Sequence, residues 1–367
     1  MRVARMTLGF LFAAGAAASA QTPADTSLKV TFGGFIDTYY AYDFGRPPSF
    51  DRSFAGGATF TTQPARHNEF NINLADVEAR ITGTRIHGRL ALQAGTSVQS
   101  NYAAEPTNGT VSGPSVSRQI QEAYAGYLVT PTLWVGAGIF FSNTGMESWA
   151  SKDNLSYTRS LVGEYASPYY SSGVRALWQA TPALAVRLDV VNGWQNISET
   201  NTDKGAGMRF DYTASPTTTI SYYNFVNPET GGRLRVFNGV GGTVTHGATS
   251  LLGQVDYGTL GPPSAGGARS NWWGFTAIAR QRMTSTVAVV GRVERYADPG
   301  QVNLTTGLPY AFQGTGASLG IDVSPDSPIM WRTEVRGFRA DAPLFPNGRL
   351  APRKTDAFVV SSLSLAF

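Results

Sequence analysis

Residues 355–367 read TDAFVVSSLSLAF, and polar and apolar side chains alternate along this stretch. The opposite face mixes polar residues such as Asp356 and Ser362 with apolar ones, and Ser361 interrupts the apolar face. A period of two residues is typical of a β-strand with one apolar side. That apolar side is made of Ala357, Val359, Leu363, Leu365 and Phe367.

Such a strand would be an aggregation hazard at the surface of a soluble protein, because nothing covers its apolar face. Lipid would cover the same face if the strand closed a β-barrel in an outer membrane. Closing strands of such barrels typically end in Phe, with apolar residues at alternate positions before it. We therefore interpret Leu363, Leu365 and Phe367 as a closing-strand signal that barrel-assembly machinery would recognise.

The amino terminus has the pattern of a secretory signal peptide. Arg2 and Arg5 precede an apolar run over residues 6–18, and Ala18-Ser19-Ala20 is a small-x-small cleavage site. The run is too short for a membrane anchor, and a buried helix would not explain the order of charge, apolar run and cleavage site. We expect residues 1–20 to be removed and residues 21–367 to form one outer-membrane domain.

Composition excludes several classes of protein. The chain has no Cys, so it has neither a disulfide framework nor a thiolate metal site. Without Arg2 and Arg5 the chain has 27 basic residues (29 minus 2) and 25 acidic ones. The basic residues form no cluster in the sequence, so nucleic-acid binding is not predicted. After the signal, no apolar run reaches the ~18–20 residues of a membrane helix, so the chain can span a membrane only as strands.

Alternating segments recur along the chain, separated in turn by short turns and long polar loops. This pattern predicts an all-β fold, a transmembrane antiparallel β-barrel. We count sixteen strands, or fourteen if the weak hairpin around residues 239–248 is left out. Both counts are even and place both termini in the periplasm. A propeller would show a repeat of ~40–50 residues, and strands of this length are long for a sandwich.

One expected strand, residues 67–83, changes phase. Apolar residues occupy even positions from Phe70 to Leu74 and odd positions from Val77 to Ile81. One extra residue around Ala75-Asp76 would keep them all on the lipid face, so we predict a β-bulge there.

Charged residues fall on the face opposite to lipid in nearly every strand. On the lipid side each would cost roughly 2–4 kcal/mol near the midplane, so we place them in a solvated lumen. Their signs nearly balance, which predicts weak discrimination between cations and anions. The candidate pore-lining residues are Asp37, Asp76, Glu78, Arg80, Arg89, Glu122, Arg175, Arg187, Asp189, Arg209, Asp211, Asp256, Arg292, Glu294, Asp322, Arg332, Glu334 and Arg336.

A structural role is the alternative for these charges, since arginine and carboxylate side chains can brace a barrel wall as ion pairs. Residues two apart on one strand suit that role, and the pairs are Arg187 with Asp189, Arg292 with Glu294, and Arg332 with Glu334.

Residues 142–160 break the alternation for nearly a whole crossing length, and Trp149, Asp153 and Tyr157 have helical spacing. We expect this segment to fold into the lumen as a constriction, because water there satisfies irregular backbone. Trp149 would lie against the wall, with Lys152, Asp153 and Arg159 bordering the passage. A plain external loop is the alternative.

Nothing in the sequence favours an enzyme. The three histidines, His67, His87 and His246, have no metal-ligand spacing, and we identify no catalytic residue, cofactor site or metal site. An outer-membrane hydrolase would need a Ser and a His on the outer wall.

Four stretches carry a family resemblance: GGFIDTYY (33–40), HNEFNINLADVE (67–78), QEAY (121–124) and GIFFSNTGME (138–147). The chain resembles the second family of β-barrel porins, the OmpL-like porins. The resemblance implies an outer-membrane channel and names no solute. We expect passive diffusion of small hydrophilic solutes, with outer-membrane lipid as a partner and a homo-oligomer as a possible assembly. The alternatives are an adhesion or structural barrel acting through its external loops and, less favoured, a hydrolase.

Overall fold

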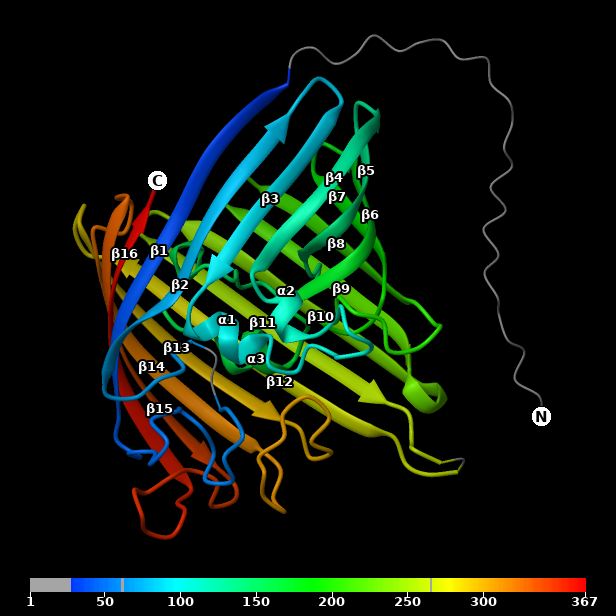
Figure 1. The fold of residues 1–367 in the computed structure, drawn as a ribbon. Coiled ribbons are helices and arrows are strands. Elements are labelled where there is room, and N and C mark those ends of the chain that lie inside the picture. The colour runs from blue at the N-terminus through cyan, green and yellow to red at the C-terminus, as the bar shows by residue number, and fades with distance from the viewer. Residues whose placement is uncertain (1–27, 61–62, 265) are drawn as a thin grey trace, which may run out of the picture.

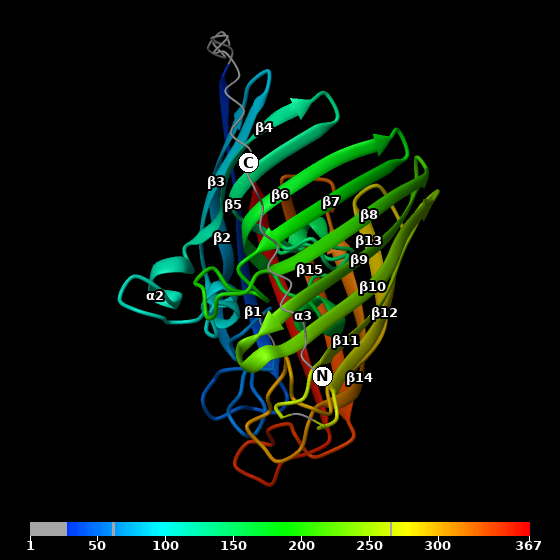
Figure 2. The ribbon, with the colours of Figure 1, turned by 90° about the vertical axis from the view of Figure 1, so that its right-hand side faces the viewer.

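The computed structural model describes residues 28–60, 63–264 and 266–367, so the predicted signal peptide, residues 1–20, lies outside the described residues. Within them, sixteen strands form one closed antiparallel barrel (Figures 1 and 2). Each strand pairs with its neighbours in sequence, and β1 pairs with β16. The strands are β1 (Lys29–Asp43), β2 (Glu69–Thr82), β3 (Ile86–Ala94), β4 (Ile120–Thr130), β5 (Leu133–Phe141), β6 (Tyr170–Thr181), β7 (Leu184–Val191), β8 (Gly205–Ser215), β9 (Thr218–Glu229), β10 (Arg233–His246), β11 (Thr249–Leu260), β12 (Ser270–Arg282), β13 (Val287–Ala297), β14 (Gln313–Val323), β15 (Ile329–Ala340) and β16 (Thr355–Ala366).

The count of sixteen is confirmed, and the alternative of fourteen is wrong. β10 and β11 pair without a break from Arg235–Leu260 to His246–Thr249. Glycines such as Gly241 and Gly242 weaken the apolar pattern of this hairpin, but the ladder needs only backbone N–H and C=O groups.

Short and long connections lie at opposite ends of the barrel (Figure 1). We call these the turn end and the loop end. The connections at the loop end contain α1 (Thr96–Asn101), α2 (Pro114–Ser117), η1 (Ser151–Asp153), α3 (Leu161–Tyr165) and η2 (Thr230–Gly232). The last of these is by itself the short link between β9 and β10. No helix in the described part of the chain is long and apolar enough to cross a membrane.

The closing strand β16 has the two faces that its sequence predicts. Its even-numbered residues from Asp356 to Ser364 are buried, and Leu363, Leu365 and Phe367 are exposed on the outside. Ser361 is tolerated on that outer face because Trp331 donates a 2.7 Å hydrogen bond to its hydroxyl. A polar atom in lipid must find such a partner.

The barrel closes where β1 meets the chain end. Gly34 N–H donates to the Phe367 carbonyl at 2.9 Å, and Phe367 N–H donates back to Gly34 at 3.1 Å. A Cβ atom at Gly34 would lie 2.7 Å from the Asp76 carbonyl oxygen of β2, which the ladder fixes, and 2.5 Å from Cζ of the Phe367 ring. The seam therefore requires glycine at this position.

The bulge in β2 exists, but the sequence placed it wrongly. The register shifts between Asp37 and Thr38, which face Leu74 and Ile72, so the extra residue is Asn73 and not Ala75-Asp76. Leu74 is buried in an inner cluster with residues such as Tyr102 instead of facing lipid. Periodicity treats every apolar side chain as lipid-facing, and the inner cluster that takes Leu74 is formed by distant elements.

Three long connections pack together over the loop end. Phe54 and Phe60 come from residues 44–68, Phe312 ends residues 298–312, and Phe345 belongs to residues 341–354. Their rings contact one another at centroid distances of 4.8 to 6.4 Å. These connections therefore form an aromatic cap over the β12–β16 side of the barrel mouth.

Candidate channel interior

Residues 142–169, which we call the inner segment, connect β5 to β6 and lie inside the barrel (Figure 2). They contain η1 and α3, so the continuous helix suggested by the spacing of Trp149, Asp153 and Tyr157 is absent from the described chain. Trp149 is buried, and its indole N–H donates to Gln93 on β3 at 2.9 Å.

Asp37 on β1 holds the middle of the inner segment. Its carboxylate accepts hydrogen bonds from Ser151 Oγ at 2.9 Å and from Tyr157 Oη at 3.3 Å. From β15, Arg332 donates to the Ser151 and Leu155 carbonyls at 2.7 Å each. Irregular backbone at this depth is thus satisfied by side chains of the wall.

Thr158 of the inner segment bonds to three charged side chains of the wall. Its hydroxyl donates to Glu334 Oε1 at 3.0 Å and accepts from Arg292 at 2.8 Å and Arg336 at 3.1 Å. A hydroxyl has one donor and two acceptor positions, so all three are used. Its N–H also donates to Glu334 at 2.8 Å, and its carbonyl accepts from Arg292 at 2.5 Å. No sequence motif marks this threonine.

The helix α3 is anchored at both ends. Ser160 caps it by accepting from Gly163 N–H at 3.1 Å, and Leu161 N–H donates to Glu294 on β13 at 2.6 Å. At the other end, the Trp272 indole on β12 donates to the Ala166 carbonyl at 2.9 Å. These contacts hold the inner segment against the β12–β13 side of the barrel.

The predicted pore-lining residues consequently fall into two groups. On β1 and on β11–β16 the charged side chains are buried; this covered group is Asp37, Asp256, Arg292, Glu294, Asp322, Arg332, Glu334 and Arg336. On β2–β8 several charges are more exposed, with exposed side-chain fractions of 59% for Arg80, 27% for Asp211 and 18% for Arg89, whereas Glu122, Arg175 and Asp189 are buried. This open group is Asp76, Glu78, Arg80, Arg89, Glu122, Arg175, Arg187, Asp189, Arg209 and Asp211.

Ion pairs form mainly between strands rather than along them. Arg292 does contact Glu294 at 3.4 Å, but Arg332 pairs with Asp322 at 2.8 Å instead of with Glu334. The predicted pairs Arg332–Glu334 and Arg187–Asp189 are therefore wrong. Residues directly opposite on adjacent antiparallel strands have Cβ atoms about 5 Å apart, which is closer than residues two apart on one strand. Asp189 accordingly pairs with Arg175, its register partner, at 2.7 Å.

The constriction candidates occupy different environments. Lys152 and Asp153 are 37% and 52% exposed and pair with each other at 3.0 Å. Arg159 is only 2% exposed, pairs with Glu164 at 3.3 Å, and lies 3.8 Å over the Tyr169 ring. Lys152 and Asp153 therefore meet lumen water directly, whereas Arg159 is part of the packing of the inner segment.

Three hollows follow one another between the loop end and the turn end. The loop-end hollow has about 360 Å³ and is bordered by Trp194, Arg235 and residues 302–305. The middle hollow, about 220 Å³, lies within the inner segment. Ser167 and Tyr169 line both this hollow and the loop-end hollow. The turn-end hollow, about 450 Å³, shares Phe141 with the middle one. All three lie away from the covered group of charges.

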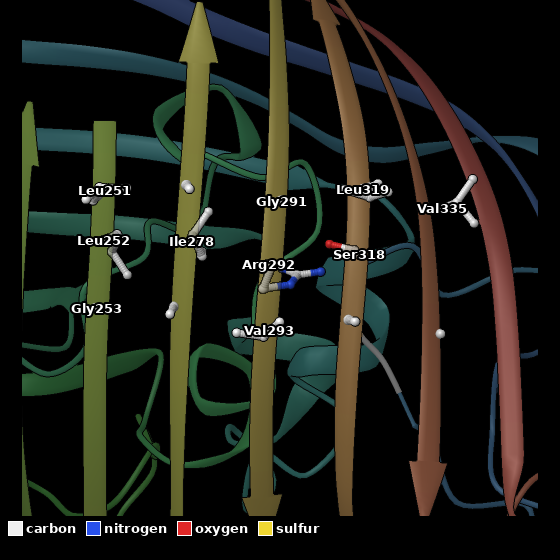
Figure 3. A pocket seen from close by; sticks show the side chains of 14 residues that line it. Leu251, Leu252, Gly253, Ile278, Gly291, Arg292, Val293, Ser318, Leu319 and Val335 are labelled. Carbon is white, nitrogen blue, oxygen red and sulfur yellow. The ribbon is translucent and has the colours of Figure 1, made fainter. Parts of the chain in front are cut away.

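A larger hollow of about 840 Å³ lies on β11–β15 (Figure 3). Most of its lining residues belong to the outward-facing set of these strands, with Leu251, Val293, Leu319 and Val335 exposed around small residues such as Gly291. It is a recess in the lipid-facing wall and not part of the lumen.

A closed sixteen-stranded barrel with an apolar outer face, charged inner strands and a segment folded into it defines an outer-membrane porin. The chain belongs to the family described as "Putative beta-barrel porin-2, OmpL-like", whose sequence pattern matches residues 29–367.

Solved structures show the same fold at low sequence identity. OmpT, an outer membrane protein of Vibrio cholerae, has 10% identity and a TM-score of 0.61, covering 93% of this chain and 98% of that one. The outer membrane channel DcaP of Acinetobacter baumannii has 12% identity and a TM-score of 0.58 over 93% and 98%. An anion-selective porin from Comamonas acidovorans has 11% identity and a TM-score of 0.59 over 93% and 100%. No curated protein matches this chain.

Proposed function

We propose that solutes diffuse through this porin on the β2–β8 side and through the middle hollow of the inner segment, with the turn end in the periplasm. The observation that carries the proposal is the division of the charged residues. The covered group holds the inner segment against β1 and β11–β16, while four residues of the open group, Arg89, Glu122, Arg175 and Arg187, line the turn-end hollow. The covered charges thus position the constriction, and these four charges line the passage at its turn end.

The middle hollow supports a limit on solute size. It is the smallest of the three at about 220 Å³, and Trp149, Arg159 and Tyr169 border it. Lys152 and Asp153, exposed on η1, face lumen water beside the buried part of the segment. We therefore assign selection by size to the inner segment.

The decisive experiment removes the inner segment. Phe141 and Tyr170 are direct register partners, so a four-residue hairpin loop can replace residues 142–169 without straining β5 or β6. We expect single-channel conductance in planar bilayers to rise severalfold, while heat-modifiable gel migration still reports a folded barrel. Shortening the exposed residues 107–111 is the matched control and should leave conductance unchanged. Equal conductance of wild type and the first variant would contradict the proposed route.

The family and the fold favour a channel without enzymatic activity, and we extend this to the whole chain. His87 lines the turn-end hollow and His67 lies at the loop end, so these two do not share a site. An adhesion barrel acting through its loops is the second candidate. It would bind a surface ligand while its purified form conducts no ions.

Three expectations about processing and assembly belong to the same proposal. Amino-terminal sequencing of the membrane-inserted protein should begin at Gln21 if residues 1–20 are a signal peptide. Crosslinking during biogenesis should join residues 363–367 to barrel-assembly machinery. One similar structure is the trimer form of OmpT from Vibrio cholerae, and native mass measurement in detergent tests for a homo-oligomer here.

A further inference from the structure

One arginine of the open group lacks the carboxylate that the others have. Arg175 pairs with Asp189, Arg209 pairs with Asp211 at 2.8 Å, and Arg89 pairs with Glu78 and Glu122. Within the described residues Arg187 forms no ion pair, and its Nε is enclosed without a hydrogen-bond partner. A guanidinium left in this state favours an anionic ligand, because its fork of N–H donors matches a carboxylate.

The register places Arg187 at the end of an apolar row. Leu128 on β4 faces Trp134 on β5, which faces Leu177 on β6, which in turn faces Arg187 on β7. All four line the turn-end hollow. Lumen-facing positions of a water-filled barrel are ordinarily polar, so three adjacent apolar side chains at this level are unexpected.

Trp134 supplies a second donor without an acceptor. Its side chain is 8% exposed, and its indole N–H is enclosed without a hydrogen-bond partner. Leaving such a donor buried and unpaired is unfavourable, so an acceptor on a bound solute would stabilise it. Two unpaired donors and an apolar row therefore border one hollow of about 450 Å³.

The charges that line the hollow also favour an anionic ligand. Three arginines line the hollow, Arg89, Arg175 and Arg187, against one carboxylate, Glu122. Arg175 is neutralised from behind by Asp189, and Arg89 binds Glu122 directly, so the unmatched positive charge is that of Arg187. On its other side Arg187 faces a further cation, Arg209, across β8.

We propose that the turn-end hollow is a solute-binding subsite for small organic anions with an apolar or aromatic body. The carboxylate binds Arg187, and the body covers Leu128, Trp134 and Leu177. Covering apolar surface that water would otherwise touch favours such solutes over acetate-sized ones. This inference rests on the proposed route, because a solute that follows the route would occupy the turn-end hollow.

Ion-current block tests the subsite with benzoate as the probe. Benzoate should reduce the KCl conductance of the purified channel at millimolar concentration, and neutral benzamide and small acetate should do so at least tenfold less effectively. Arg187→Gln should raise the half-blocking benzoate concentration at least tenfold. Trp134→Phe, which keeps an aromatic ring but removes the N–H, should raise it by a smaller factor.

The matched control is Arg349→Gln, because Arg349 is an exposed arginine of residues 341–354 at the loop end and does not line this hollow. Its half-blocking concentration should equal that of wild type. Normal conductance with benzoate no more effective than benzamide, or equal effects of Arg187→Gln and Arg349→Gln, would overturn the subsite. A wild-type protein that conducts no ions would instead contradict the proposed function, so the two failures are distinguishable.

Discussion

Thr158→Val is the sharpest test of how the inner segment is held. Valine has nearly the shape of threonine but no hydroxyl, so Glu334, Arg292 and Arg336 each lose one hydrogen bond. Hydrogen bonds to charged groups contribute roughly 1.5–3 kcal/mol each. Arg292 and Glu334 keep their own 2.6 Å pair, which offsets part of the loss. We therefore expect docking of the segment to weaken by about 3 kcal/mol.

A change of this size multiplies the population of the undocked segment by roughly a hundred, since about 1.4 kcal/mol corresponds to a factor of ten. Single-channel recordings should then show brief openings to a higher conductance level about a hundred times more often. Limited proteolysis within residues 142–169 should accelerate in parallel. Heat-modifiable gel migration should not change, because the strand ladders of the barrel are untouched.

Thr158→Ser is the control, because serine keeps the hydroxyl and its three hydrogen bonds. It should behave as wild type in both assays. If Thr158→Val showed neither additional openings nor faster cleavage, the buried network would not be what holds the segment, and the reasoning would be refuted.

Two further predictions concern the seam and the loop end. Gly34→Val should prevent closure of the barrel, since its side chain would overlap the Asp76 carbonyl of β2 as well as the Phe367 ring, and heat-modifiable migration should be lost. Gly253→Val, with no atom near its Cβ, should fold normally. Burial holds the pKa of His67 below its ordinary value, and the Asp43 carboxylate offsets this only in part. The undocked loop binds the proton more readily, so docking of residues 44–68 should weaken as pH falls through about 6.5. Hydrogen exchange of this loop should be faster at pH 5 than at pH 7.5 in wild type but not in His67→Gln, and equal pH dependence of both proteins would contradict this.

Local pattern was sufficient for the barrel itself. The alternation in residues 355–367 correctly separated the outer face from the inner face of β16, and the same reading gave sixteen strands. This works because each strand meets lipid on one side and the lumen on the other, so its own residues specify both faces. Turn residues then mark where each crossing ends.

The alternation could not predict which side chains contact one another inside the barrel. The sequence predicted an ion pair between Asp189 and Arg187. The register between β6 and β7 instead places Asp189 opposite Arg175, with which it forms the ion pair, and Arg187 forms none in the described chain. The sequence also predicted Leu74 on the lipid face, although Leu74 is buried in an inner cluster of distant residues. Such outcomes depend on which residues of other strands lie opposite, and that is decided only when the barrel closes.

The inner segment shows the same division. Its broken alternation could be seen in the sequence, but its position depends on Thr158 meeting Arg292, Glu334 and Arg336 from strands far along the chain. Periodicity carries no information about contacts between residues more than a hundred positions apart. The sequence alone therefore determined the barrel and most of its two faces, and it left the strand count at sixteen or fourteen. Only the tertiary structure decided which charges are covered and which remain open to the lumen, because burial there depends on where the inner segment docks.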